Sequence, residues 1–202
     1  MSGASNPPPK PPSADDNAFK RELVALIPHL RAFARTLTGD PTAADDLAQD
    51  AMMKAWDARA SYQMGTNMKA WTFMILRNQF YSEKRRSWRQ SQLDQEAAER
   101  TLVAVDDPEA PVALDELRQA LKTLPEEQRE ALILVGAGGF AYEEAAEICG
   151  CAVGTVKSRV SRARRALQAT LERGGYGRDG RAAGDAMRSI LADADRLSGA
   201  RE

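Results

Sequence analysis

Apolar residues recur at helical spacing along most of the chain, and no stretch alternates apolar and polar residues as a half-buried strand would. The first periodic segment, residues 19–37, predicts one amphipathic helix, which Gly39 is placed to end. Its apolar positions are Phe19, Leu23, Leu26, Ile27, Leu30, Phe33, Ala34 and Leu37. The pattern as a whole predicts an all-α fold.

Two further helices are predicted in the first half of the chain. Residues 40–42 (Asp-Pro-Thr), with Asp45 three positions after the threonine, resemble a capping box at the start of a helix that reaches about Asp57. The loop after this helix ends at Asn67. Asn67 can cap a third helix, which continues to about Arg86.

The composition changes between residues 91 and 116, where eight Asp/Glu accompany one Arg and two prolines interrupt the chain. Such a stretch favours a flexible acidic linker between two small, loosely tethered helical domains. The second domain opens with a helical stripe of leucines at Leu114, Leu117, Leu121 and Leu124. Pro125 then begins another helix, with Glu126 and Glu127 in the first turn, where the helix dipole favours anions.

Residues 141–173 predict a short acidic helix, a Cys-Gly-Cys turn and a longer basic helix. The longer helix has a buried stripe at Val156, Val160, Ala163 and Leu167, and an opposite face that contains Lys157, Ser158, Ser161, Arg162 and Arg165. Residues 155–173 contain six Lys/Arg and one Glu, whereas residues 125–154 contain six Glu and one Arg. Small hydroxyls beside cations favour a helix that reads DNA base edges over a merely solvated face.

The whole chain of 202 residues has a net charge of −1 and a pI of about 6.0, so nucleic-acid binding must come from local patches. No window contains the roughly 20 apolar residues that a membrane span needs, so we expect no membrane insertion. Residues 1–16 lack the apolar core of a secretory signal and contain a proline run. We expect a disordered arm and a cytoplasmic protein.

The titratable residues give little support to catalysis. Cys149 and Cys151 are the only cysteines and His29 is the only histidine, so no second pair completes a four-ligand zinc site. We interpret the cysteines as small side chains in a turn. The glycines of residues 136–139 lack the Lys-Ser/Thr of a phosphate loop. We expect no catalytic residue, no metal and no cofactor, and hence a protein that is not an enzyme.

Two surfaces of the first domain have unusual patterns. The second helix has a polar stripe formed by Asp46, Gln49, Asp50 and Met53. Residues 77–90 contain five Lys/Arg and one Glu, interleaved with Phe80, Tyr81 and Trp88. Rings among cations suit melted nucleic acid, because stacking is worth about 1–3 kcal/mol per base. A solvated face and a basic helix end with Phe80 in the core are the simpler alternatives.

Taken together, three segments resemble the bacterial extracytoplasmic-function (ECF) sigma factors, the smallest members of the sigma-70 family. They are DDLAQDAMMKAW (45–56), GTNMKAWTFMILRNQFYSEKRR (65–86) and EEAAEICGCAVGTVKSRVSRARRAL (143–167), and the likeness covers roughly residues 17–87 and 113–173. The sequences GTNMKAW and AEICGCAVGTVKSRVSRARRAL are most similar to those of the EcfG-type general stress response sigma factors.

The resemblance implies a role for each surface. Asp46, Gln49, Asp50 and Met53 would bind the β′ clamp of core RNA polymerase, whose β flap is a further expected contact. Gly65, Thr66 and Asn67 would lie beside a base extruded from the non-template strand, and Arg77, Asn78, Tyr81, Lys84 and Arg85 along the minus-10 element. Lys157, Ser158, Ser161 and Arg162 would read the minus-35 element, with Thr155 and Arg165 on phosphates. An anti-sigma protein is a further implied partner.

The resemblance, together with the composition of the arm and linker and the apolar pattern of the tail, predicts an order of segments, of which the tail lies outside the family pattern. These are a disordered arm (1–16), a region-two domain (17–90), an acidic linker (91–112), a region-four helix-turn-helix domain (113–173) and a tail with a short amphipathic helix (174–202). Ala141 and Ala152 stand where the family pattern often has serine and proline.

Two other functions remain open from the residues alone. A stand-alone helix-turn-helix regulator would leave the first domain unexplained. A sigma-like decoy that sequesters an anti-sigma factor would not need to keep Lys157, Arg162 and the basic run of residues 84–86.

Overall fold

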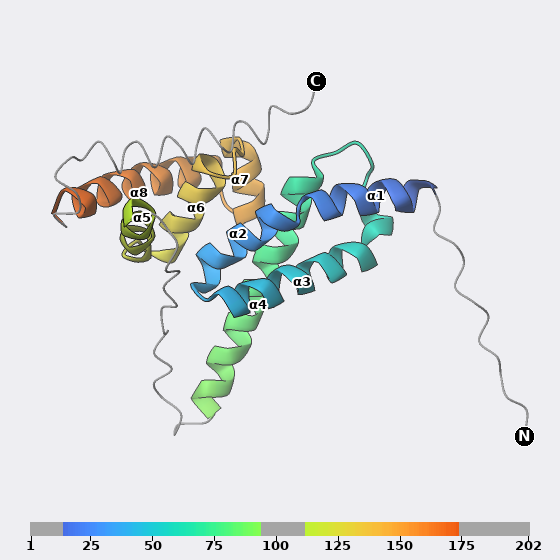
Figure 1. Cartoon of the computed structure of the whole chain (residues 1–202), viewed down its shortest axis with the longest axis horizontal. Coiled ribbons are helices and arrows are strands. Elements are labelled where there is room, and N and C mark those ends of the chain that lie inside the picture. The colour runs from blue at the N-terminus through green and yellow to red at the C-terminus, as the bar shows by residue number, and fades with distance from the viewer. Residues whose placement is uncertain (1–13, 94–111, 174–202) are drawn as a thin grey trace, which may run out of the picture.

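The computed structural model describes residues 14–93 and 112–173, in which every regular element is a helix (Figure 1). The N-terminal half, residues 14–93, contains α1 (Ala14–Ala25), α2 (Ile27–Thr38), α3 (Pro41–Asp57), the short 3-10 helix η1 (Arg59–Ser61) and α4 (Met68–Leu93). The C-terminal half, residues 112–173, contains α5 (Val112–Lys122), α6 (Glu126–Gly136), α7 (Tyr142–Cys149) and α8 (Val153–Arg173). The all-α prediction is confirmed. Most of the predicted arm and linker, and the predicted tail helix, lie outside the described residues.

The single helix predicted over residues 19–37 is wrong, because the chain bends between α1 and α2. Pro28 lies in the first turn of α2, where its missing N–H needs no partner; inside a continuous helix it would remove a hydrogen bond and clash with an earlier carbonyl. The apolar stripe nevertheless continues across the bend, and Leu30 is completely buried. Gly39 ends α2 in the left-handed conformation, as predicted. Helix α1 begins at Ala14, inside the predicted disordered arm.

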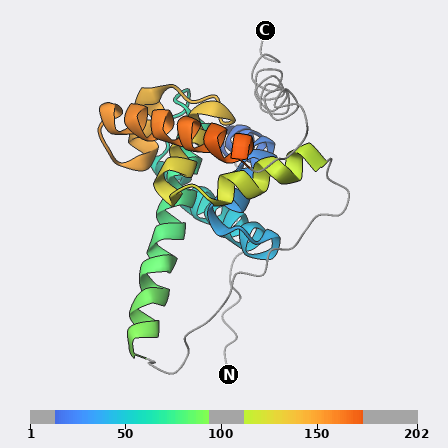
Figure 2. The same cartoon turned by 90° about the vertical axis from the view of Figure 1, so that its left-hand side faces the viewer.

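The helix starts are partly as predicted. Asp40 caps α3, because its carboxylate accepts a hydrogen bond from the Thr42 N–H at 2.9 Å. The predicted capping box is wrong, since the guanidinium of Arg31 donates to Asp45 at 2.7 Å instead. Asn67 caps α4 as predicted, accepting from the Ala70 N–H at 3.0 Å. Helix α4 then extends beyond the predicted end to Leu93, and its outer part projects from the other helices (Figures 1 and 2).

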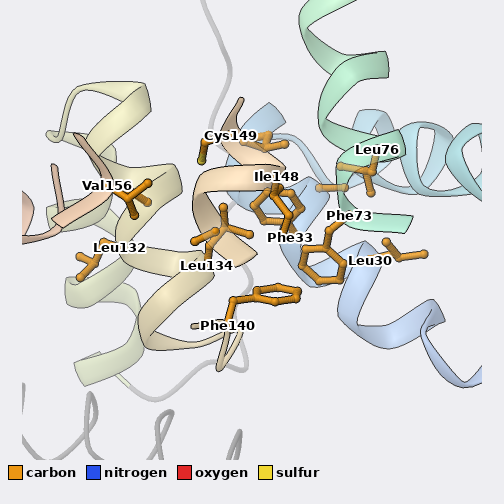
Figure 3. Close-up of a cluster of buried hydrophobic side chains, with 14 of the residues drawn as sticks. Leu30, Phe33, Phe73, Leu76, Leu132, Leu134, Phe140, Ile148, Cys149 and Val156 are labelled. Atoms are coloured by element: carbon orange, nitrogen blue, oxygen red, sulfur yellow. The ribbon is translucent and has the colours of Figure 1, made fainter. Parts of the chain in front are cut away.

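The two halves pack against each other and share one apolar core, which the expectation of loosely tethered domains did not predict. Helix α2 contacts α6 and helix α4 contacts α7, and one cluster of buried side chains includes residues of both halves (Figure 3). Phe73 of α4 stacks on Phe33 of α2 at a centroid distance of 4.8 Å. Phe73 also makes a T-shaped contact with Phe140, which precedes α7, at a centroid distance of 5.0 Å. Phe73 therefore joins the cores of both halves.

The C-terminal half follows the predicted hairpin. Gly150 ends α7 in the left-handed conformation, and the Cys151 N–H donates to the Ala146 carbonyl at 3.0 Å. Glu144 accepts from the Ala141 N–H at 2.9 Å, so a carboxylate supports the helix start that lacks a serine. Cys149 is buried and Cys151 is half-buried, both as free thiols. Within the described ranges, no helix is both long and apolar enough to cross a membrane.

Replacing Leu30 with alanine tests the shared core. Leu30 has 0% of its surface exposed, so Leu30→Ala should leave a cavity and lower the free energy of unfolding by about 2–5 kcal/mol. Urea unfolding followed by circular dichroism measures this loss. Val24→Ala is the control, since Val24 is 48% exposed, and it should change the free energy by less than about 0.5 kcal/mol. Equal effects of the two substitutions would contradict the assignment of the core.

The two thiols should differ in reactivity. Burial raises the pKa of Cys149 to about 12, so almost none of this thiol is ionised at pH 8. We expect Cys151, which is half-buried, to be alkylated by iodoacetamide well before Cys149 in the folded protein, as measured by mass spectrometry. Cys151→Ser should remove the early modification and Cys149→Ser should retain it. Early modification at Cys149 would contradict the buried position of this side chain.

Candidate nucleic-acid interface

Helix α8 separates an apolar side from a polar side, as the sequence predicted. Its buried stripe comprises Val156, Val160, Ala163 and Leu167. On the other side, Lys157, Ser161, Arg162 and Arg165 are exposed, and Thr155 and Ser158 are half-buried. The six residues predicted to contact the minus-35 element therefore lie on one accessible side of this helix.

Contacts within the helix-turn-helix hold several of these side chains. Arg162 donates from Nη2 to the Ser158 hydroxyl at 3.0 Å and from Nε to the Ser158 carbonyl at 3.2 Å. The Ser158 hydroxyl in turn donates to the Thr155 carbonyl at 2.9 Å. The Lys157 ammonium lies 5.6 Å from the ring centroid of Tyr142 on α7. Because these contacts are local and solvent-exposed, the cations can exchange them for an anionic ligand at low cost.

Arg159 differs from the other cations of α8. Its guanidinium donates to Glu127 on α6 at 2.6 Å and lies 3.7 Å from the Cys151 sulfur. Arg159 therefore ties α8 to α6 and to the turn. Counting charge along the sequence could not separate Arg159 from the exposed cations of α8, although its position beside the buried Val160 was a signal.

The polar stripe predicted on the second helix is exposed on α3. Asp46, Gln49 and Asp50 are exposed, and Met53 retains 59% of its surface. The alternate face, with Leu47, Ala51 and Ala55, is buried. An exposed methionine beside carboxylates is a combination typical of a surface that binds a partner.

The loop before α4 is exposed but ordered by its own hydrogen bonds. Gly65 has a positive φ of 87°, which favours glycine, and Thr66 and Asn67 follow it at the surface. The Tyr62 hydroxyl donates to the Thr66 carbonyl at 2.7 Å, and the Thr66 hydroxyl donates to the Gln63 carbonyl at 2.7 Å. Met64, which the sequence prediction did not include, is also exposed in this loop.

The residues predicted along the minus-10 element divide into two groups. Asn78 and Arg85 are exposed. Arg77, Tyr81 and Lys84 instead contact carboxylates of the C-terminal half, as does Asn67 at the start of α4. The sequence analysis did not anticipate these contacts, because nothing in a local pattern links residues some 50 positions apart.

Glu130 of α6 is at the centre of these contacts, with its side chain completely buried. The Arg77 Nε donates to Glu130 at 2.6 Å, the Tyr81 hydroxyl donates at 3.3 Å, and the Arg77 guanidinium lies 4.5 Å from the Tyr81 ring centroid. Burial raises the pKa of Glu130, while the hydrogen bond from Arg77 acts in the opposite direction. Burial also raises the pKa of Tyr81, which keeps its hydroxyl a donor.

Comparison with known proteins places both halves in one family. The chain matches the family models described as "Sigma-70 region 2" over residues 23–90 and "Sigma-70, region 4" over residues 114–167. It is 47% identical over 155 residues to the ECF RNA polymerase sigma factor EcfG of Rhodopseudomonas palustris, covering 77% of this chain and 86% of the relative. It is 33% identical over 134 residues to the ECF RNA polymerase sigma factor SigC of Mycobacterium tuberculosis, covering 66% and 72%.

Two solved structures share the arrangement of helices. One is the sigma factor RpoE in complex with the anti-sigma factor NepR from Bartonella quintana, with a TM-score of 0.70, 47% identity and coverage of 78% of this chain and 98% of that one. The other is CnrH in complex with the cytosolic domain of CnrY, with a TM-score of 0.58, 25% identity and coverage of 79% and 90%. Both halves of the chain, in this order and at this similarity, show that it belongs to the ECF sigma factors of the sigma-70 family.

Proposed function

We propose that this chain binds core RNA polymerase, recognises the minus-35 and minus-10 elements of promoters and promotes DNA melting to initiate transcription. The observation that carries the proposal is the separation of surfaces. A polar stripe on α3 and a basic, serine-containing face on α8 are exposed on different helices, each with a buried apolar face behind it.

The α3 stripe is the proposed attachment to the polymerase clamp. Asp46, Gln49, Asp50 and Met53 all lie on its exposed side. Carboxylates and an exposed methionine can combine charge pairing with apolar contact, which gives both orientation and affinity.

The α8 face is the proposed reader of the minus-35 element. Arg162 can donate two parallel hydrogen bonds to a guanine edge, and Ser158 and Ser161 are small enough to let the helix approach the bases. Thr155 and Arg165 flank this group and would contact phosphates.

The loop of residues 65–67 and helix α4 are the proposed minus-10 surface. A flipped base would be captured beside Gly65, while Asn78, Tyr81 and the cations of α4 follow the single strand. Capture of one unstacked base offsets an unstacking cost of a few kcal/mol, which favours melting. Attachment to polymerase would raise the effective concentration of both surfaces at the promoter.

The similarity to EcfG and to RpoE bound to the anti-sigma factor NepR supports two finer proposals. The genes served would belong to a general stress response, and an anti-sigma protein would hold the chain away from polymerase. A stand-alone helix-turn-helix regulator is the weaker alternative, because it assigns no role to the exposed stripe of α3.

Reversing one charge on α3 tests the attachment to polymerase. Asp50→Arg should abolish co-elution with core polymerase in size-exclusion chromatography and lose transcription at every promoter, because it places a cation where the proposed partner surface binds an anion. Glu22→Arg, an equal charge reversal at an exposed position of α1, is the control and should behave like the unmodified chain. Normal polymerase binding by Asp50→Arg would show that the clamp surface lies elsewhere.

Truncating Arg162 tests the reader helix. Arg162→Ala should lower transcription in vitro with core polymerase by about tenfold or more from promoters with an intact upstream element, since a good base contact is worth about 1–3 kcal/mol. Templates with a scrambled upstream element should be affected much less. Arg21→Ala removes the same charge from exposed α1 and controls for general electrostatics. Equal losses on both templates would place Arg162 outside sequence recognition.

A further inference from the structure

The loop of residues 63–66, between η1 and α4, is exposed at every position. It contains Gly65 and Thr66, which the proposed function places beside a flipped base. A loop that captures a base does so more tightly when it already has the required shape, because ordering the chain during binding reduces the affinity. The contacts that hold this loop therefore bear on promoter melting.

One buried side chain reaches across the loop. Tyr62 is the residue immediately before the loop, and its hydroxyl donates to the carbonyl of Thr66, the last residue of the loop, at 2.7 Å. The same carbonyl accepts the Met68 N–H at 3.1 Å. Tyr62 therefore fastens the far end of the loop where the chain enters α4.

Aromatic side chains of two helices hold the ring of Tyr62. Phe19 of α1 packs against it edge-on at a centroid distance of 5.6 Å, and Trp71 of α4 lies at 5.1 Å. Phe19 and Trp71 also contact each other at 6.1 Å, so the three rings form one cluster. Because close packing of this kind restricts side-chain rotation, the Tyr62 hydroxyl is presented at a fixed point.

The chain on either side of the loop is also anchored. Arg59 of η1 donates to the Trp56 carbonyl at 3.0 Å and to Asp16 of α1 at 2.9 Å, which fixes the approach to Tyr62. Asn67 caps α4 on the other side. The hydrogen bond from Tyr62 extends this rigid frame into the exposed loop.

We propose that Tyr62 is a positioning residue for promoter melting, whose hydroxyl holds the loop of residues 63–66 in the shape that captures a flipped base. Tyr62 acts through the loop and makes no contact with DNA of its own, because its ring is buried. The inference rests on the proposed function of the loop and adds to it a residue outside the predicted DNA-contacting set. The alternative is a purely structural hydrogen bond, which would affect stability alone.

The test removes one hydroxyl and keeps the ring. Tyr62→Phe loses the hydrogen bond to Thr66 and retains the aromatic packing. Ser61→Ala is the matched control, since the hydroxyl of this adjacent, exposed residue also donates to a backbone carbonyl at 2.7 Å, but to Ala58, away from the loop. Circular dichroism should show the same helix content for both variants and the unmodified chain.

Amide hydrogen exchange of the full chain, followed by NMR, measures the order of the loop. The Thr66 N–H donates to the Gln63 carbonyl and the Met68 N–H to the Thr66 carbonyl, so both amides report on loop opening. Tyr62→Phe should speed exchange at these two amides by about three- to tenfold, the size of effect expected for one lost hydrogen bond. Ser61→Ala should leave the exchange of both amides unchanged.

Melting is measured with core polymerase on two templates, by the reactivity of unpaired thymines with permanganate. One template is a fully paired promoter, and the other carries mismatches that leave its minus-10 element unpaired. Tyr62→Phe should slow open-complex formation on the paired promoter by about three- to tenfold. On the mismatched template the loss should be less than about twofold, because the base is already unstacked and its capture is no longer needed for opening.

Three results would overturn the inference. The first is an equal loss on both templates, since a general defect of the folded chain does not distinguish paired from unpaired DNA. The second is unchanged exchange at Thr66 and Met68 in Tyr62→Phe, and the third is normal melting despite faster exchange. If the unmodified chain opens the paired promoter, these results leave the proposed function standing, whereas failure of the unmodified chain to open it would overturn both.

Discussion

The arrangement of the two halves depends on one buried carboxylate. Glu130 lies on α6 beside apolar side chains of the shared core, and its carboxylate accepts hydrogen bonds from Arg77 and Tyr81 of α4. If the halves separate, the charged groups of Glu130 and Arg77 must both become solvated by water. If they stay together, the desolvation of both groups is compensated by paired hydrogen bonds and by the packing of Phe73 on Phe140. The balance between these terms decides whether the molecule is closed or open.

The cost of losing this contact depends on how it is lost. Breaking a buried pair by removing one partner costs about 3–5 kcal/mol, whereas separating both partners into water costs much less, since each is solvated again. An external ligand would favour separation of the halves only by as much as it bound the separated form more tightly. The exposed stripe of α3 is available for such a ligand while the halves remain in contact.

The sequence predicted well those features that depend on neighbouring residues. The buried stripe of α8 follows from four apolar positions on one side of a helix, and the cap of α4 follows from a single asparagine before an apolar run. The break at Pro28 was missed because the apolar period continues across it, so periodicity outweighed the local rule for proline. Asp45 pairs with Arg31 on α2 because α2 and α3 pack side by side, which a capping pattern alone cannot reveal.

The contact between the halves could not be predicted in the same way. Its members are an arginine and a tyrosine in a basic segment and a glutamate in an acidic one, and each looks like an ordinary solvated residue in its own helix. The one available signal was Glu130 itself, which stands next to Ala131 and Leu132 in the most apolar part of α6. A charge in such a position indicates a distant partner but does not say which one.

Arginine at position 77 suits both partners that it is proposed to have. Its planar fork matches the two oxygens of a carboxylate and those of a phosphate, and its charge persists in a buried site, where a lysine would lose its proton more readily. Burial lowers the pKa of Arg77, but the hydrogen bond and charge of Glu130, together with other neighbouring groups, raise the pKa on balance, so the group remains a cation where the halves are in contact. The guanidinium would therefore need no change of protonation to exchange the carboxylate for a phosphate. Tyr81 also suits two partners. Its hydroxyl donates to Glu130 where the halves are in contact, and its ring could stack on a base if it were uncovered. The hydrogen bonds that join the two halves therefore keep Arg77 and Tyr81 in the protonated forms that their proposed role requires.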